Sequence, residues 1–334
     1  MLSANVLPSV MLNIKKILLP VDIPIASLSV VHQAATLARH FNSEILMLHV
    51  ATAQSHAAGV PEDISELAGW DLLGVIISGA QKQQDQSLGP ELDGLTIRRM
   101  VVQGDPAWAI VQVAEEENAD LIMMPSHGST FNRFLLGSVT AKVLHGSERP
   151  VWTGAHVEES ENPSNVNNPL FLYGGVGVDV MRLTQAIGSE VKTRQSAQEF
   201  AIRNVLCAID LGSRSNEAVS WAAAMAAEFG ARLTLVHVTA SMELWGPGGN
   251  YVDEKLQEGF VSDASHRIAK LQQDMGIKAD DVFIGSGDVP KALSRIAKQS
   301  SADLLVTGCY PYGGNLRTHG YAIICAVSIP VLSV

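Results

Sequence analysis

Short apolar runs alternate along the chain with longer stretches in which apolar residues recur every three or four positions. In the first half, the runs 15–22 and 43–50 enclose such a stretch, with apolar positions at Leu28, Val31 and Ala35. The short runs are typical of buried strands, and the longer stretches are typical of amphipathic helices. Their alternation predicts an α/β protein with a parallel sheet covered by helices on both faces.

This pattern occurs twice. KKILLPVD (15–22) matches RNVLCAID (203–210), and SEILMLHV (43–50) matches ARLTLVHV (231–238). Between the matched runs, the first predicted helix runs into Asn42 and the second into Gly230. Asparagine and glycine best tolerate the left-handed conformation that ends many helices. Further along, residues 103–125 match residues 286–308. There Asp105 and Asp288 are predicted helix N-caps, each with a proline in the following turn.

The repetition predicts two tandem domains, residues 12–155 and 200–334, with a linker over 156–199. Each domain is expected to have a five-stranded, mostly parallel sheet. The linker begins with a polar, turn-rich sequence and continues with an apolar, glycine-rich one, so part of it is expected to pack or to add a strand. On this interpretation the halves have sheets of their own, and a single sheet running through both would count against it.

Composition narrows the classes of protein. The 334 residues carry a net charge of -11 and no cluster of Lys and Arg, which argues against a nucleic-acid partner. No apolar run has the length of about 18 residues that a membrane span needs, and no basic segment precedes an apolar one as in a signal peptide. The three cysteines predict reduced thiols, and the ten histidines lack metal-ligand spacing. We therefore expect a cytoplasmic protein without a metal site.

Several segments, in this order, carry a family resemblance: LLPVD and CAID at strand ends, LHV, GDP, ADLIMMPSHG, FLLGSV and RPVW. With them the chain resembles the universal stress protein family, as two tandem copies. The resemblance implies two adenine-nucleotide-hydrolase-like domains that pair with each other through their last strands. Some members of the family bind ATP and others do not.

The phosphate loop of the ATP-binding members departs from its pattern in the first copy. The pattern is Gly, two residues, Gly, nine residues, Gly, then Ser or Thr. Gly128, Gly137 and Ser138 match it, but Pro125 replaces the first glycine, and eight residues separate Gly128 from Gly137. Proline has no amide hydrogen, so one phosphate donor is missing. The helix predicted to begin at Ser138 still offers free amides and a favourable dipole to an anion.

The second copy is degenerate in the same region. Gly308 keeps the first glycine, but Pro311 stands three positions on, and the Gly-Ser pair is replaced or absent. Gly313, Gly314 and Arg317 offer a different anion nest as an alternative.

The resemblance implies nucleotide-binding residues at the strand ends and in these loops. They are Pro20, Val21, Asp22, Val50, Met124, Ser126, His127, Gly128, Gly137, Ser138, Val139, Thr140, Asp210, Gly212, Ser213, Val238 and Gly308. A structural role is the alternative for each kind of residue. The two aspartates then close turns, and Gly137 to Thr140 only begin a helix. His49 and His237 match each other, and packing at a strand end is the expected role for both.

Two functional hypotheses follow from these residues. The first is a tandem universal stress protein that binds ATP in stress response or signalling, with Mg²⁺ only if ATP binds. The second is a protein-interaction or regulatory module that keeps only the fold. No catalytic constellation occurs in the sequence, so we do not expect an enzyme, although slow ATP hydrolysis stays open, as does a homodimer.

Overall fold

The computed structural model describes most of both halves of the chain. The described residues are 12–21, 28–52, 92–125, 136–154, 200–212, 215–239, 243–246, 249–252, 254–308 and 317–334. The predicted linker lies outside them, so the domain bounds 12–155, 156–199 and 200–334 stay predictions.

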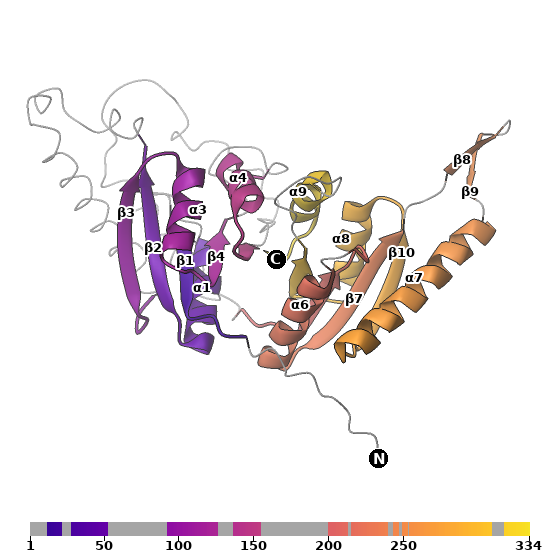
Figure 1. Cartoon of the computed structure of the whole chain (residues 1–334), viewed down its shortest axis with the longest axis horizontal. Coiled ribbons are helices and arrows are strands. Elements are labelled where there is room, and N and C mark those ends of the chain that lie inside the picture. The colour runs from indigo at the N-terminus through magenta and orange to yellow at the C-terminus, as the bar shows by residue number, and fades with distance from the viewer. Residues whose placement is uncertain are drawn as a thin grey trace, which may run out of the picture. The chain divides into compact units, whose positions relative to one another are not determined.

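The first half contains five strands in the order β3-β2-β1-β4-β5, with all neighbours parallel. Its elements are β1 (Lys16–Pro20), α1 (Leu28–Phe41), β2 (Glu44–Ala51), β3 (Ile97–Gln103), α3 (Pro106–Glu116), β4 (Leu121–Met124), α4 (Ser138–Gly146) and β5 (Val151–Thr153). They can be followed from indigo to magenta in Figure 1.

The second half repeats this order as β10-β7-β6-β11-β12, again with parallel neighbours. Its elements are β6 (Asn204–Ala208), α6 (Ser215–Phe229), β7 (Arg232–Thr239), α7 (Glu254–Met275), β10 (Asp281–Ser286), α8 (Val289–Gln299), β11 (Leu304–Thr307), α9 (Arg317–Ala326) and β12 (Val331–Ser333). The shared strand order confirms the duplicated α/β fold.

The last strands of the two halves pair with each other. Val331 faces Thr153 and Ser333 faces Val151 in an antiparallel ladder, which joins the two five-stranded sheets into one ten-stranded sheet. The expectation that a continuous sheet would count against duplication is therefore wrong. The join is a single antiparallel pairing, and the strand order on each side of it is the same. It is also the last-strand pairing that the family resemblance implied.

Helices cover both faces of the sheet. Leu18, Leu46 and Ile122 belong to one buried cluster with Ile110 of α3 and Val143 of α4. Successive side chains of a strand point to opposite faces. The residues directly before and after Leu18, Leu46 and Ile122 in each strand therefore face the other side of the sheet, where α1 contacts β1, β2 and β4. In the second half, α8 and α9 contribute to the same cluster, whereas α6 contacts β6, β7 and β11.

Local signals in the sequence are confirmed at helix ends. Asp105 accepts a hydrogen bond from the amide of Trp108 (3.0 Å), and Asp288 accepts one from the amide of Lys291 (3.1 Å). Asn42 has φ 53° and Gly230 has φ 61°, the left-handed conformation expected after α1 and α6.

One element was not predicted by the repeat. Strands β8 (Glu243–Gly246) and β9 (Gly249–Val252) form an antiparallel hairpin between β7 and α7. It forms a two-stranded sheet separate from the ten-stranded one (Figure 1). The signal that was overlooked is the Pro-Gly pair between the two runs, which favours a turn.

Candidate functional site

The carboxyl ends of β6, β7 and β11 meet where the strand order of the second half reverses. From β6 the chain proceeds to β7 and β10 on one side, and then returns to β11 and β12 on the other. Strands β6 and β11 lie side by side, and the loops that follow them therefore lead to opposite faces of the sheet. In open α/β sheets this reversal leaves a crevice in which ligands bind.

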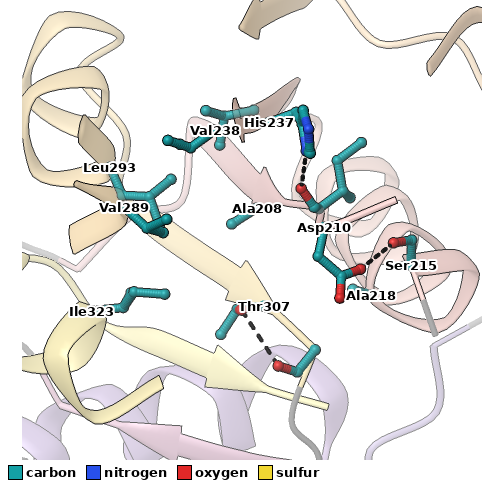
Figure 2. Close-up of a pocket in the computed structure, with 13 residues that line it drawn as sticks. Ala208, Asp210, Ser215, Ala218, His237, Val238, Val289, Leu293, Thr307 and Ile323 are labelled. Atoms are coloured by element: carbon teal, nitrogen blue, oxygen red, sulfur yellow. Dashed lines mark hydrogen bonds between the residues drawn. The ribbon is translucent and has the colours of Figure 1, made fainter. Parts of the chain in front are cut away.

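A pocket of about 160 Å³ lies at this reversal. Three strand ends and three helices line it (Figure 2). The lining residues are Ala208, Ile209, Asp210, Ser215, Ala218, Val236, His237, Val238, Val289, Leu293, Thr307, Gly308 and Ile323. Figure 2 shows Val289, Leu293 and Ile323 across the pocket from Asp210 and Ser215. The pocket thus has an apolar side, formed by α8 and α9, and a polar side after β6.

Asp210 closes the turn between β6 and α6. Its Oδ1 accepts hydrogen bonds from the amide of Gly212 and from the hydroxyl of Ser215, both at 2.8 Å. Leu211, which lies between Asp210 and Gly212, has φ 60°. The turn fixes the carboxylate at the pocket wall, where the side chain is exposed. The structural role that the sequence offered for Asp210 is therefore present, and the residue also lines the pocket.

The matched histidines make the same hydrogen bond in both halves. Nδ1 of His237 lies 2.8 Å from the carbonyl oxygen of Ile209, and Nδ1 of His49 lies 3.2 Å from that of Val21. A carbonyl oxygen only accepts, so Nδ1 carries the proton in each ring. Packing at a strand end thus describes both histidines. His237 also lines the pocket, which the sequence did not predict, although its repetition at equivalent strand ends was a signal.

The structure brings three of the predicted second-half residues to the pocket. Asp210, Val238 and Gly308 line it, and Gly212 contacts Asp210 through its amide. Ser213 lies outside the described residues. The pocket residues from α8 and α9 were not predicted, because the sequence does not show which side of each helix faces the strand ends.

The predicted first-half residues lie partly outside the described chain. Asp22, Ser126, His127 and Gly128 are not among the described residues. The others end the strands or begin α4. They are Pro20 and Val21 at β1, Val50 in β2, Met124 in β4, and Gly137, Ser138, Val139 and Thr140 at α4.

Gly137 is the N-cap of α4, so the helix begins at Ser138 as predicted. Thr140 is buried, and its hydroxyl donates to the carbonyl oxygen of Pro125 at 3.0 Å. This bond ties the start of α4 to the end of β4. A phosphate contact for these residues stays a prediction.

Among the residues that the structure describes, no group of three His, Cys, Asp or Glu side chains is arranged to hold a metal ion. No helix in the described ranges is both long and apolar enough to cross a membrane. Cys207 is fully buried, and burial raises the pKa of its thiol.

Fold and pocket together define a tandem α/β protein with a crevice at the strand ends, and comparison with known proteins names the family. The sequence model of the Universal stress protein family matches residues 13–153 and 201–317. The chain belongs to the Universal stress protein family.

Individual relatives match one half of the chain at a time. Universal stress protein MJ0531 of Methanocaldococcus jannaschii is 32% identical over 140 residues, which are 41% of this chain and 79% of the relative. Universal stress protein A of Escherichia coli (strain K12) is 26% identical over 139 residues, or 40% of this chain and 95% of the relative.

A solved structure matches both halves together. A universal stress protein from Archaeoglobus fulgidus superimposes with a TM-score of 0.58 at 19% identity, covering 95% of each chain. At that identity the likeness shows the fold alone, and it extends to the tandem arrangement.

Proposed function

We propose that this chain binds an adenine-containing ligand of the nucleotide class in the second-half pocket. One observation carries the proposal. The pocket lies at the strand-order reversal and includes Asp210, Val238 and Gly308, three of the nucleotide-binding residues that the family resemblance implies. The coincidence of the pocket with three of the implied binding residues supports a binding role for it.

The pocket's two sides suit the two ends of such a ligand. Val238, Leu293 and Ile323 give apolar surface against which a flat heterocycle packs. The carboxylate of Asp210 lies on the other side, where it accepts hydrogen bonds from ribose hydroxyls or an amino group. Together these groups orient a base and a sugar.

For the first half, the proposal is ATP at the N-terminus of α4, with Mg²⁺ only as the partner of the triphosphate. Gly137 and Ser138 support it, because a helix N-terminus has unpaired amides and a positive dipole end. We place this function in the cytoplasm, in stress response or signalling, without catalysis. The homodimer stays a prediction.

A second function, a regulatory module without a nucleotide, is favoured by one observation in the first half. Pro125 removes an amide donor, and its carbonyl oxygen holds the hydroxyl of Thr140. The backbone nitrogen of Pro125 and the hydroxyl of Thr140 are therefore both unavailable as hydrogen-bond donors to a phosphate.

The variant Gly308→Val tests the proposal at the second-half pocket. A Cβ at Gly308 would meet no atom of the described residues within 4 Å, and its φ lies outside the left-handed region. The valine side chain therefore occupies open space in the pocket at little cost to the fold. The matched control is Gly259→Val on the exposed surface of α7, where a Cβ also meets no described atom within 4 Å.

Thermal unfolding with adenosine and with ATP gives the readout. A ligand at 100 times its dissociation constant stabilises the folded state by about 2.7 kcal/mol. We expect at least one of the two ligands to raise the melting temperature of the wild type and of Gly259→Val. For adenosine we expect the shift to be lost in Gly308→Val. Unchanged melting of the wild type at millimolar concentrations of both ligands would refute the proposal.

A further inference from the structure

The ladder that joins the two halves is centred on a pair of equivalent residues. Pro150 and Pro330 open the last strands of the two halves, so residues there correspond at a spacing of 180 positions. In the ladder Trp152 faces Leu332, which is its equivalent by that spacing. A twofold axis places each residue near it opposite the same residue of the partner. The join therefore has the local symmetry of a twofold dimer, although both of its sides come from one chain.

The ends of α1 and α6 meet in the same way. Here the spacing is 188 positions, and Nε2 of His40 lies 3.1 Å from Oε1 of Glu228, its equivalent. The ring of His40 also stacks on Phe229, with the ring centroids 4.2 Å apart. Phe229 in turn meets its own equivalent, Phe41, edge to face. Two equivalent helix ends thus form one contact between the halves.

On the opposite face of the sheet, α4 and α9 make a third contact between equivalent residues. The hydroxyl of Tyr321 donates to the carbonyl oxygen of Ala141 at 2.7 Å, and these two residues are again 180 positions apart. Contacts between equivalents therefore occur in the ladder and on both faces of the sheet. This pattern places all three contacts close to one local twofold axis.

At these contacts the equivalent residues have become complementary partners. Trp152 and Leu332 are both buried, and the large ring of one faces the smaller side chain of the other. A carboxylate only accepts hydrogen bonds, so Nε2 of His40 carries a proton and donates it to Glu228 in a hydrogen bond. One pair thus combines a large side chain with a smaller one, and the other combines a donor with an acceptor.

Pairing between like halves would lose this complementarity. If two first halves met in the same register, Trp152 would face a second Trp152, and overpacking of a filled core is destabilising. If two second halves met, Leu332 would face Leu332 and leave space, and the carboxylates of two Glu228 side chains would repel each other. The surface of each half is therefore matched to the other half and mismatched to its own copy.

We propose that Trp152, Leu332, His40 and Glu228 select the unlike half as the partner of each last-strand surface. The partner is recognised by side-chain size in the ladder and by hydrogen bonding between α1 and α6. Two chains that associate would then use another surface or exchange unlike halves, and would not pair like halves. The inference does not depend on a ligand, so its outcome is independent of the proposed function.

Single variants recreate the like-half contacts inside the intact chain. His40→Glu sets a glutamate against Glu228, as in a pair of second halves, and Glu228→His sets a histidine against His40, as in a pair of first halves. The chain with both substitutions restores an unlike pair in reverse. In urea unfolding we expect His40→Glu to raise the unfolding equilibrium constant by about threefold or more, and the double variant to return to within about twofold of the wild type. The control is Glu258→His at an exposed position of α7, which should change the constant by less than about twofold.

A second tryptophan in the ladder tests the recognition by size. Leu332→Trp should raise the unfolding equilibrium constant of the wild type by about tenfold, because two indole rings then face each other. In the Trp152→Leu background the same substitution pairs a tryptophan with a leucine again. Its cost there should be smaller by at least about threefold.

The two pairs are judged separately. A double variant no more stable than His40→Glu would overturn the selection by hydrogen bonding between α1 and α6. An equal cost of Leu332→Trp in both backgrounds would overturn the selection by size in the ladder. If Leu332→Trp does not fold in the wild type, folding in the Trp152→Leu background supports the selection by size, and failure in both backgrounds contradicts it.

Discussion

Replacing Asp120 by alanine should destabilise the first half at the start of its central strand. Oδ2 of Asp120 accepts hydrogen bonds from the backbone amides of Lys15 at 2.7 Å and Lys16 at 2.9 Å. Asp120 immediately precedes β4, and its own amide donates to the carbonyl oxygen of Lys16. One side chain thus fixes the start of β1 beside the start of β4.

The second half repeats the arrangement at Asp303. Its Oδ2 accepts from the amides of Arg203 at 2.8 Å and Asn204 at 3.0 Å, and its amide donates to the carbonyl oxygen of Asn204. Each aspartate follows an alanine and precedes an apolar strand, the Ala-Asp pair found in both copies of the sequence. If the halves descend from one duplicated domain, Asp303→Ala should cost about as much as Asp120→Ala.

The magnitude follows from the hydrogen bonds that are lost. A hydrogen bond to a charged group contributes about 1.5–3 kcal/mol, so two would contribute about 3–6 kcal/mol. Water can reach the amides of Lys15 and Arg203, since those two bonds are exposed. Rehydration therefore reduces the expected loss to about 2 kcal/mol for each variant. The double variant should lose about 4 kcal/mol, because the two aspartates share no partner.

Urea unfolding measures these losses as changes in the free energy of unfolding. The control is Asp274→Ala on α7, an exposed aspartate, which should change the free energy by less than about 0.5 kcal/mol. A loss below about 0.5 kcal/mol in both aspartate variants would refute the proposed role of the side chains. A large loss in one half and none in the other would refute their equivalence.

Two further predictions concern a buried tryptophan and an ion-paired glutamate. Trp152→Phe should lower the free energy of unfolding by about 3 kcal/mol in urea titrations, because it leaves Oε1 of buried Gln33 without its 2.8 Å partner Nε1. A loss below about 1 kcal/mol would contradict this. Hydrogen bonds from Arg98, and then Lys16, lower the pKa of Glu117 to about 2. The stability that Glu117 contributes is therefore present above about pH 4.3 and lost as pH falls towards 2. In Glu117→Gln, the free energy of unfolding measured in urea should therefore depend less on pH over that interval. An equally steep acid loss in the variant would refute the assignment.

Much of the fold was readable because its signals are local. The caps Asp105 and Asp288 and the left-handed Asn42 and Gly230 depend only on their own neighbours in the chain. The join between the halves was different. Which strand β12 pairs with is decided by tertiary packing, and the runs 151–153 and 331–333 do not by themselves show that the sheet continues through them. The pairing of the last strands was expected only from the family resemblance.

The site, like the fold, could be predicted from the sequence only in part. The family resemblance pointed to Asp210, Val238 and Gly308, and parallel strands bring their carboxyl ends, where these residues lie, to one edge of the sheet. Leu293 and Ile323 come from helices, whose rotation over the sheet depends on core packing that a single sequence does not give. His237 was expected only to pack, and its second position at the pocket wall needed coordinates.

The most direct test of the central claim is a crystal structure of the intact chain grown with saturating adenosine. We predict density for the base and ribose at the carboxyl ends of β6, β7 and β11, with the sugar beside Asp210 and the base against Leu293. An empty second-half pocket, or adenosine bound only elsewhere, would contradict the account.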